Sequence, residues 1–437
     1  MISALVLSLA FTSSANDNIN DPEPEPEPEP EPKRKSGLTD MDRRLLSQRV
    51  TYGFPKDASE EMFRFGFSKY MEHAWPHDEL LPLTCTAGDR YGQYMTTLVD
   101  ALPAAFLFMS DAELTDLVAT KLISLDFNRD VNVSVFETNI RILGGLVSTY
   151  LLAEEKGYLT PELRSFVLSK AVDIADRLMP AFDTPTGMPY GTVNLMHGVP
   201  PKETTVTCTA GVGTFIMEFG ALSRITNDPK YEVAARRALR SLWKYKSGLG
   251  LFGNHIDIRT GHWVAHGSSV GTYTDSFYEY LVKASFLFND PELQCMAVEA
   301  MNAAAAYLKH DGWLSSVNMN TGTRTEHRTD SMAAFWPGLL VLDGDVDSAL
   351  QLADNICKMW DKYGFTAEFW AVPSLQVEDR FSAYPLRPEL IESLFYLSWA
   401  KRPLFSNDKI QNFGYKMLKS IQTHCRVPCG YSGVNWK

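Results

Sequence analysis

Apolar residues recur at three- and four-residue spacing along most of the chain after about position 58. This is the spacing of one buried helical face, so it predicts a nearly all-helical protein of about thirteen helices. The sequence has no sustained alternation of the kind typical of strands, although short strands in loops would escape such a pattern. The predicted helices are Ser59–Trp75, Gly92–Met109, Asp111–Ser124, Ser134–Glu155, Pro161–Leu178, Ala210–Thr226, Pro229–Lys246, Thr274–Phe288, Pro291–Lys309, Asp330–Leu342, Val346–Tyr363, Pro388–Ala400 and Asn407–His424.

The junctions between these helices repeat. Asn-Asp-Pro occurs at 227–229 and again at 289–291, each time between two helices. Asp before Pro joins a helix cap to a residue that suits the first turn. Repeated helical hairpins of this kind predict an α/α solenoid or toroid.

Two long segments between hairpins, Leu178–Val206 and Lys246–Thr272, are rich in Gly, Pro, His and aromatic residues. Loops of that length in a compact domain usually carry function. In a closed toroid they would gather at one end and build a pocket there.

The N-terminal residues predict a processed and extended leader. Residues 1–15 have the pattern of a signal peptide, with an apolar run too short to span a bilayer and small residues before a cleavage point. Alternating Glu and Pro make residues 16–38 a linker that cannot bury a core. The folded domain is expected over 39–437. No later run of 18 apolar residues occurs, so no transmembrane segment is expected.

Charge and cysteines narrow the class of partner. The formal net charge of −12 argues against nucleic acid and against an anionic membrane surface. The six cysteines show no CxxC spacing, which argues against zinc, and a secreted chain predicts at least one disulfide. Asn132 begins an Asn-Val-Ser sequon and is a candidate glycosylation site.

Two acids near helix starts are candidates for chemistry. Glu137 stands four residues before Arg141 among apolar neighbours, so it is either partly buried, as a general acid needs, or one half of an ordinary exposed ion pair. Asp275 follows Gly-Thr-Tyr-Thr, and local sequence alone favours a helix cap over a catalytic role there.

Two further acids are candidates, and each of the four is a weak signal on its own. Glu389 follows Pro388 in a first helical turn beside Arg387, where the helix dipole favours a low-pKa carboxylate suited to a base, or simply a helix start. Glu218 is a lone acid in an apolar helix, which predicts that it faces a polar cavity or a cation. Together these are four acids on four helices that could converge at one mouth of a toroid.

Longer motifs resemble those of class I α-mannosidases, glycoside hydrolase family 47. They are 72–80 (Glu-His-Ala-Trp-Pro-His-Asp-Glu-Leu), 97–102, 135–145, 275–281 and 386–397. Residues 335–339 (Phe-Trp-Pro-Gly-Leu), 207–211 and 384–389 resemble the ER-degradation-enhancing branch. The resemblance implies an (αα)7 barrel that removes terminal α-1,2-linked mannose from high-mannose N-glycans on misfolded glycoproteins, with inversion, in the endoplasmic reticulum lumen.

The resemblance also implies roles for single residues. Glu137 and Asp275 match the two candidate general acids, and Glu389 matches the general base. The residues that match sugar-binding positions are Arg141, Glu218, Arg387 and Glu392. Ca2+ is the implied cofactor, and an oxidoreductase is a candidate partner. Cys85 and Cys429 match cysteines that this branch is expected to pair, whereas unlinked thiols remain the alternative because Cys425 lies close enough to compete.

The sequence departs from the family pattern at its C-terminal end, and this suggests an alternative function. Family members continue into a further helix and a terminal Thr-Glu strand whose threonine binds calcium, and neither follows Lys437 here. We therefore expect a barrel that lacks its last helix and strand, and weak or absent calcium binding. The alternatives to a hydrolase are a non-catalytic lectin that binds mannose or a client protein, and an unrelated α/α toroid.

Overall fold

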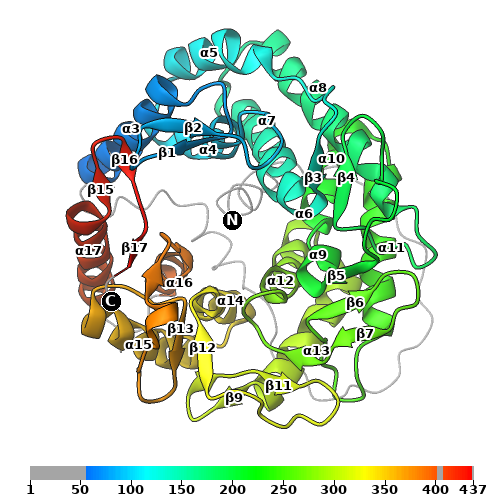
Figure 1. Cartoon of the computed structure of the whole chain (residues 1–437), viewed down its shortest axis with the longest axis vertical. Helices are drawn as coiled ribbons and strands as arrows, with labels where there is room; N and C mark the ends of the chain where they lie inside the picture. The colour runs from blue at the N-terminus through cyan, green and yellow to red at the C-terminus, as the bar shows by residue number, and fades with distance from the viewer. Residues whose placement is uncertain (1–55, 401–406, 436–437) are drawn as a thin grey trace, which may run out of the picture.

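The computed structural model describes residues 56–400 and 407–435. The predicted signal peptide, the Glu-Pro linker and the first part of the predicted folded domain lie outside these ranges. Within them, helical hairpins follow one another around a ring, and the chain alternates between an outer and an inner helix (Figure 1). The predicted all-α toroid is confirmed.

The outer helices are amphipathic, whereas the inner ones bury most of their surface. In α11 the buried residues form one stripe, but α12 is buried along nearly all of its length. A helix that is apolar all round needs neighbours on every side, which the inner ring provides. The outer helices are α3 (Lys56–His73), α5 (Asp111–Thr120), α8 (Pro161–Leu178), α11 (Lys230–Lys244), α13 (Pro291–Tyr307), α15 (Val346–Tyr363) and α17 (Asn407–His424). The inner helices are α4 (Thr96–Phe108), α7 (Gly144–Lys156), α10 (Ile216–Thr226), α12 (Asp275–Phe288), α14 (Trp336–Asp343) and α16 (Glu389–Trp399).

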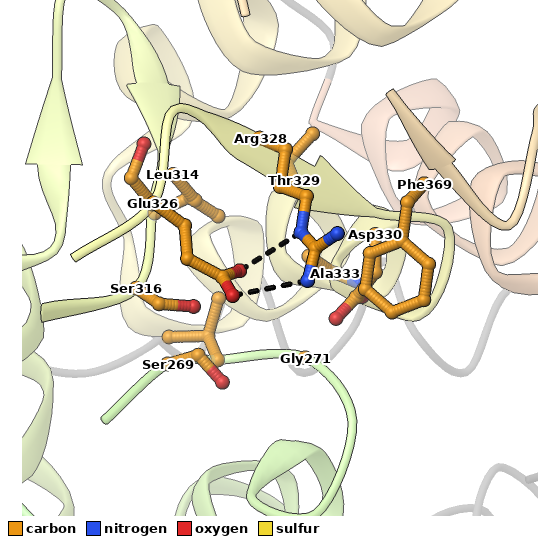
Figure 2. A pocket seen from close by; sticks show the side chains of 12 residues that line it. Ser269, Gly271, Leu314, Ser316, Glu326, Arg328, Thr329, Asp330, Ala333 and Phe369 are labelled. Carbon is orange, nitrogen blue, oxygen red and sulfur yellow. Dashed lines mark hydrogen bonds and ion pairs between the residues drawn. The ribbon is translucent and has the colours of Figure 1, made fainter. Parts of the chain in front are cut away.

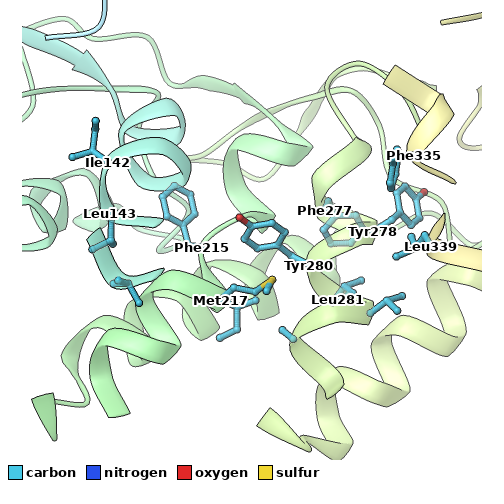
Figure 3. Packing of buried hydrophobic residues seen from close by; sticks show 14 of the residues in the cluster. Ile142, Leu143, Phe215, Met217, Phe277, Tyr278, Tyr280, Leu281, Phe335 and Leu339 are labelled. Atoms are coloured by element: carbon cyan, nitrogen blue, oxygen red, sulfur yellow. The ribbon is translucent and has the colours of Figure 1, made fainter. Parts of the chain in front are cut away.

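Aromatic and aliphatic side chains fill the space between neighbouring inner helices. Figure 3 shows Phe215 beside α10, Phe277 and Tyr280 on α12, and Phe335, the residue that precedes α14 in the chain. Phe277 and Tyr278 meet edge to face with ring centroids 5.2 Å apart, and Tyr278 meets Trp336 in the same way at 5.3 Å. Such edge-to-face pairs add specific geometry to apolar burial, so they fix the spacing of α12 and α14.

Short antiparallel strands, which the periodicity could not reveal, lie in the loops between helices. Each has only two or three residues, too few for a visible alternation. The pairs are β1 (Glu79–Leu81) with β2 (Thr86–Gly88), β3 (Asn132–Ser134) with β4 (Thr192–Asn194), β8 (Gly267–Ser268) with β11 (Val317–Asn318), β9 (Lys309–His310) with β10 (Trp313–Leu314), β12 (Arg328–Asp330) with β13 (Phe369–Ala371), β14 (Ala383–Tyr384) with β17 (Val434–Asn435), and β15 (Arg426–Val427) with β16 (Gly430–Tyr431). One sheet has three strands, β5 (Val206–Cys208), β6 (His255–Asp257) and β7 (Trp263–Ala265).

Several predicted helix boundaries are wrong, each for a tertiary reason. Residues 92–95 are not helical, because the N–H groups of Gly92, Gln93 and Tyr94 bind the side chain of Asp78. The helix predicted at Ala210–Thr226 breaks after α9 (Thr209–Gly213), where the Thr214 carbonyl accepts a hydrogen bond from Asn139. Asp330 ends strand β12 and does not start a helix.

The helix predicted at Ser134–Glu155 is not one regular helix. It begins with the short α6 (Val135–Glu137), capped by Ser134, and passes through a π-helical segment, Thr138–Leu143, before α7. A π-turn inside a helix shifts the side chains that follow it, and such turns often occur at functional sites.

The ring closes where α3 meets the C-terminal hairpin β15–β16, at the upper left of Figure 1. A disulfide joins Cys85 to Cys429 with their Cα atoms 5.5 Å apart, so the predicted pairing is confirmed. Arg426 binds Glu61 of α3 at 2.7 Å, and Tyr431 packs edge-on against Phe65 with ring centroids 5.7 Å apart. These contacts link residues from opposite ends of the described chain. Across 56–400 and 407–435, no helix is both long enough and apolar enough to cross a membrane.

Candidate active site

The candidate acids lie at the N-terminal ends of inner helices. Asp275 and Glu389 are the first residues of α12 and α16, Glu218 stands in the first turn of α10, and Glu137 ends α6 ahead of α7. Because the chain alternates between outer and inner helices, all the inner helices run in the same direction. Their N-terminal ends and the long loops before them therefore share one end of the ring, as the sequence predicts.

Glu137 belongs to a half-exposed group of ions. Its Oε2 accepts a hydrogen bond from Arg141 Nε at 2.7 Å, and Arg141 Nη1 binds Asp100 Oδ2 of α4 at 3.0 Å. The Arg141 guanidinium also lies over the ring of Tyr91, 5.5 Å from its centroid. Glu137 is thus both partly buried and ion-paired, so each of the two sequence interpretations holds in part. Asp100 was not among the predicted site residues.

Glu218 is buried among neutral partners. Its carboxylate accepts hydrogen bonds from the Tyr280 hydroxyl at 2.6 Å and from Asn139 Nδ2 at 3.1 Å. Burial raises the pKa of Glu218 to about 7, although both hydrogen bonds act in the opposite direction. The partners that the structure gives this acid are thus neutral, a tyrosine and an amide. That Glu218 faces a polar cavity or a cation stays a prediction.

Asp275 is buried at the start of α12 but is not the helix cap, which is Thr274. Its Oδ1 accepts a hydrogen bond from the backbone N–H of Ser276 at 2.7 Å. Burial raises the pKa of Asp275 to about 7, and the negative charges of Asp330 and Glu279 add to this rise. A carboxyl group with this pKa carries a proton in about half of the molecules at neutral pH, as a general acid requires.

Glu389 is the clearest departure from the sequence prediction. Helix position and the charge of Arg387 both lower its pKa, but burial outweighs them and raises the pKa of Glu389 to about 7. The Arg387 guanidinium points to another acid, since its Nη2 lies 3.2 Å from both carboxylate oxygens of Glu368. Glu389 Oε2 has no hydrogen-bond partner among the described residues. It is therefore a free, buried acceptor.

Lys283 is an unpredicted member of the site. This buried residue of α12 donates from Nζ to Glu279 at 2.5 Å and to Glu392 of α16 at 3.0 Å. The Glu392 Oε2 atom is buried and has no partner in the part of the chain that the structure describes. The signal in the sequence was a lone lysine four residues after a glutamate in an apolar helix. That spacing fits an ion pair on one helical face.

Asp330 is a second unpredicted acid, and it lies between the site and a small cavity. It accepts backbone hydrogen bonds from Thr272 at 3.1 Å and Ala333 at 2.9 Å, and burial raises its pKa. The cavity beside it has a volume of about 20 Å3, enough for about one water. Figure 2 shows its rim, where Arg328 forms a paired ion bridge to Glu326 and stacks near Phe369.

The described side chains do not make a complete calcium cage. Calcium takes six to eight oxygen ligands. Within 56–400 and 407–435, no group of three or more His, Cys, Asp or Glu side chains is arranged to hold a metal ion. The two free carboxylate oxygens of Glu389 and Glu392 could hold water around an ion, but they are too few to ligate it alone. Weak calcium binding therefore stays a prediction.

A ring of helical hairpins with buried, proton-bearing carboxyl groups at one end has the parts that acid–base hydrolysis of a glycoside requires. Comparison with known sequences agrees. The pattern of Glycosyl hydrolase family 47 matches residues 62–435, and the chain belongs to this family.

Similar proteins cover the same part of the chain. The human "ER degradation-enhancing alpha-mannosidase-like protein 2" is 42% identical over 87% of this chain and 65% of its own length. "Alpha-mannosidase I MNS4" of Arabidopsis thaliana is 43% identical over 87% of this chain and 60% of its own length. The chain thus spans less than two thirds of either relative. Among solved structures, "alpha-1,2-mannosidase from Trichoderma reesei" superposes with a TM-score of 0.78 and 25% identity, covering 87% of each chain.

Asn132, the predicted glycosylation site, is exposed on β3, and its Oδ1 accepts a hydrogen bond from Asn194 Nδ2 at 2.9 Å. Its glycosylation stays a prediction.

Proposed function

We propose that this chain hydrolyses terminal α-1,2-linked mannose from high-mannose N-glycans, with inversion at the anomeric carbon. The observation that carries the proposal is the pair Asp275 and Glu389. Both are buried, both have a pKa of about 7, and they lie close enough for the charge of Asp275 to raise the pKa of Glu389. Two such carboxyl groups are the parts of an inverting mechanism, which holds them roughly 6.5–9.5 Å apart.

In the proposed reaction, Asp275 gives its proton to the oxygen of the leaving sugar as the C1–O bond breaks. Glu389 accepts a proton from the water that attacks C1 from the opposite face. The unpartnered Oε2 of Glu389 supports this role, because a base must be free to accept. Of the two candidate acids, Asp275 suits proton donation better, since Glu137 is already bound to Arg141.

The remaining site residues would hold sugar hydroxyls. Arg141 and Arg387 are donors, and the Nε of Arg387 is buried without a partner in the described residues. Glu392 offers a free acceptor, and Glu218 with Tyr280 forms the wall between α10 and α12. Charged and amide groups of this kind fix the orientation of a polyol through directional hydrogen bonds.

The biological setting that we propose is the endoplasmic reticulum lumen, where trimming would mark misfolded glycoproteins for degradation. The relatives named for endoplasmic reticulum degradation and the disulfide between Cys85 and Cys429 support it. Ca2+ and an oxidoreductase remain candidate cofactor and partner.

The test is to incubate the purified chain with a high-mannose N-glycan and to measure free mannose and the mass of the remaining glycan. Following the anomers of the released sugar by NMR adds the stereochemistry: inversion yields the β-anomer first. Asp275→Asn is the matched inactive variant. A chain that binds the glycan but releases no mannose is the non-catalytic lectin, and retention of configuration rejects the inverting mechanism.

A further inference from the structure

The motif 72–80 contains a buried carboxylate that the proposed reaction does not use. Asp78 is fully buried, and its two oxygens accept hydrogen bonds from one short loop. The backbone donors are the N–H groups of Tyr91 (3.1 Å), Gly92 (2.9 Å), Gln93 (2.8 Å), Tyr94 (2.8 Å) and Thr96 (3.3 Å). The Thr96 hydroxyl is a further donor at 3.0 Å. One side chain thus organises the whole segment before α4.

Asp78 also completes the start of helix α4. The residue at the cap position, Met95, has a left-handed backbone and provides no side-chain hydrogen bond. The first N–H groups of a helix need partners, and a negative charge there is favourable. Asp78 provides both, because its carboxylate binds the Thr96 N–H and its carbonyl oxygen accepts from the Thr97 N–H at 2.9 Å. Asp100, which binds Arg141, lies one turn further along this helix.

The loop that Asp78 binds, residues 91–96, contacts Arg141 and the neighbour of Glu137 directly. Gln93 and Met95 have positive φ angles of 60° and 58°. A residue other than glycine adopts such a backbone conformation only where other contacts stabilise it. Tyr94, between them, is buried and shares a hydrogen bond of 2.9 Å between its hydroxyl and that of Thr138, next to Glu137. Tyr91 lies under the Arg141 guanidinium.

We propose that Asp78 is a positioning residue for Glu137 and Arg141, acting through Tyr91, Tyr94 and the α4 residue Asp100. Tyr91 and Asp100 contact Arg141, and Tyr94 contacts Thr138, the neighbour of Glu137. All three lie in the segment that Asp78 organises or in the helix that follows it, so loosening this segment moves the pair as a unit. The proposal rests on the proposed function only for its effect on turnover. Its structural part can be tested in a chain without activity.

The test compares Asp78→Asn with wild type. Asparagine keeps the size, but its NH2 group cannot accept the hydrogen bonds of the loop. We expect faster hydrogen exchange in two segments, 91–96 and 137–141, and unchanged exchange in α12 and α16. We also expect kcat/KM for mannose release to fall by about 10- to 100-fold in the folded protein, because small misplacements of site residues cost that much. Tyr94→Phe, which removes only the contact with Thr138, should give a smaller decrease.

Asp290→Asn is the matched control for stability. Asp290 caps the outer helix α13 through the Leu293 N–H and binds Arg236, far from the site. It should lower the melting temperature without changing kcat/KM. If Asp78→Asn behaves like this control, with exchange at 137–141 unchanged, the residue is only structural and the proposal is overturned. If wild type itself releases no mannose, the proposed function fails, while the exchange data still decide the role of Asp78.

Discussion

The acidic end of the ring has two regions that compensate carboxylate charge in different ways. Around Glu137 the acids are half exposed, and Arg141 binds two of them. Around Asp275 and Glu389 the acids are buried, and burial raises the pKa of each to about 7, at Glu389 against the opposing charge of Arg387. Carboxyl groups at the same end of parallel helices thus differ in charge compensation. This difference fits the roles that we propose, sugar binding by charge in one region and proton exchange at neutral pH in the other.

Removing the cation Lys283 from the buried region should have the largest effect, a decrease in the free energy of unfolding. In Lys283→Met, both Glu279 and Glu392 lose their buried partner, and breaking a buried ion pair from one side costs about 3–5 kcal/mol. Urea unfolding should show this loss in the free energy of unfolding. Lys358→Met, at an exposed ion pair of α15, should change it by less than about 1 kcal/mol. Equal effects in the two variants would mean that Lys283 does not hold the buried region together.

The next effect concerns catalysis. Glu389→Gln should lower kcat by roughly two orders of magnitude or more while glycan binding stays measurable, because glutamine cannot accept a proton from water. Rates of mannose release at saturating glycan, with calorimetry for binding, provide the measurement. Unchanged turnover would remove Glu389 from the role of base and leave the difference between the two regions without a catalytic meaning.

The buried acids should also change how stability depends on pH. Because the pKa of Glu218 is raised, the folded chain holds a proton that the unfolded chain loses between about pH 4 and 7, so this group destabilises the fold as pH rises through that window. Glu218→Gln should therefore gain about 2–3 kcal/mol in the free energy of unfolding, relative to wild type, on going from pH 5 to pH 8.

Glu292→Gln is the control with the opposite sign. Its hydrogen bond with Arg240 lowers the pKa of Glu292, so this group stabilises the fold at neutral pH, and the stabilisation is lost as pH falls below its unfolded value. Relative to wild type, that variant should therefore change little from pH 5 to pH 8, and it should lose stability as pH rises through the unfolded pKa of about 4.5. The same sign in both variants would contradict the assignment of raised and lowered values.

The smallest expected effect is on the pH profile of activity. Asp275 must hold its proton and Glu389 must have lost it, so kcat/KM should peak near pH 7 and fall on both sides. The negative charge of Glu392 helps to raise the pKa of Glu389. Glu392→Gln should therefore move the acidic limb of the profile to lower pH, even where it also weakens glycan binding. A limb that stays in place would show that burial alone sets the pKa of Glu389.

Much of this protein could be predicted from local sequence. Helix periodicity and caps such as Asp290-Pro291 determined the hairpins, because helix formation depends on neighbours three and four residues apart. The motifs identified the family and the positions of Glu137, Asp275 and Glu389. Resemblance to the family, rather than spacing, indicated the pairing of Cys85 with Cys429.

Only the tertiary structure decided the pKa of those residues and which side chains and backbone groups contact them. Glu389 looked like a low-pKa base from its helix position and from Arg387, but desolvation is a sum over elements remote in sequence and outweighs both. Lys283 became part of the site because α16 brings Glu392 to it across 109 positions of sequence. Gly92 lies in a segment with helical periodicity and yet is not helical, since Asp78, 14 positions earlier, binds its N–H group. Periodicity reports which face of a segment is buried, whereas long-range contacts decide which hydrogen bonds its backbone makes and which protons its carboxyl groups keep.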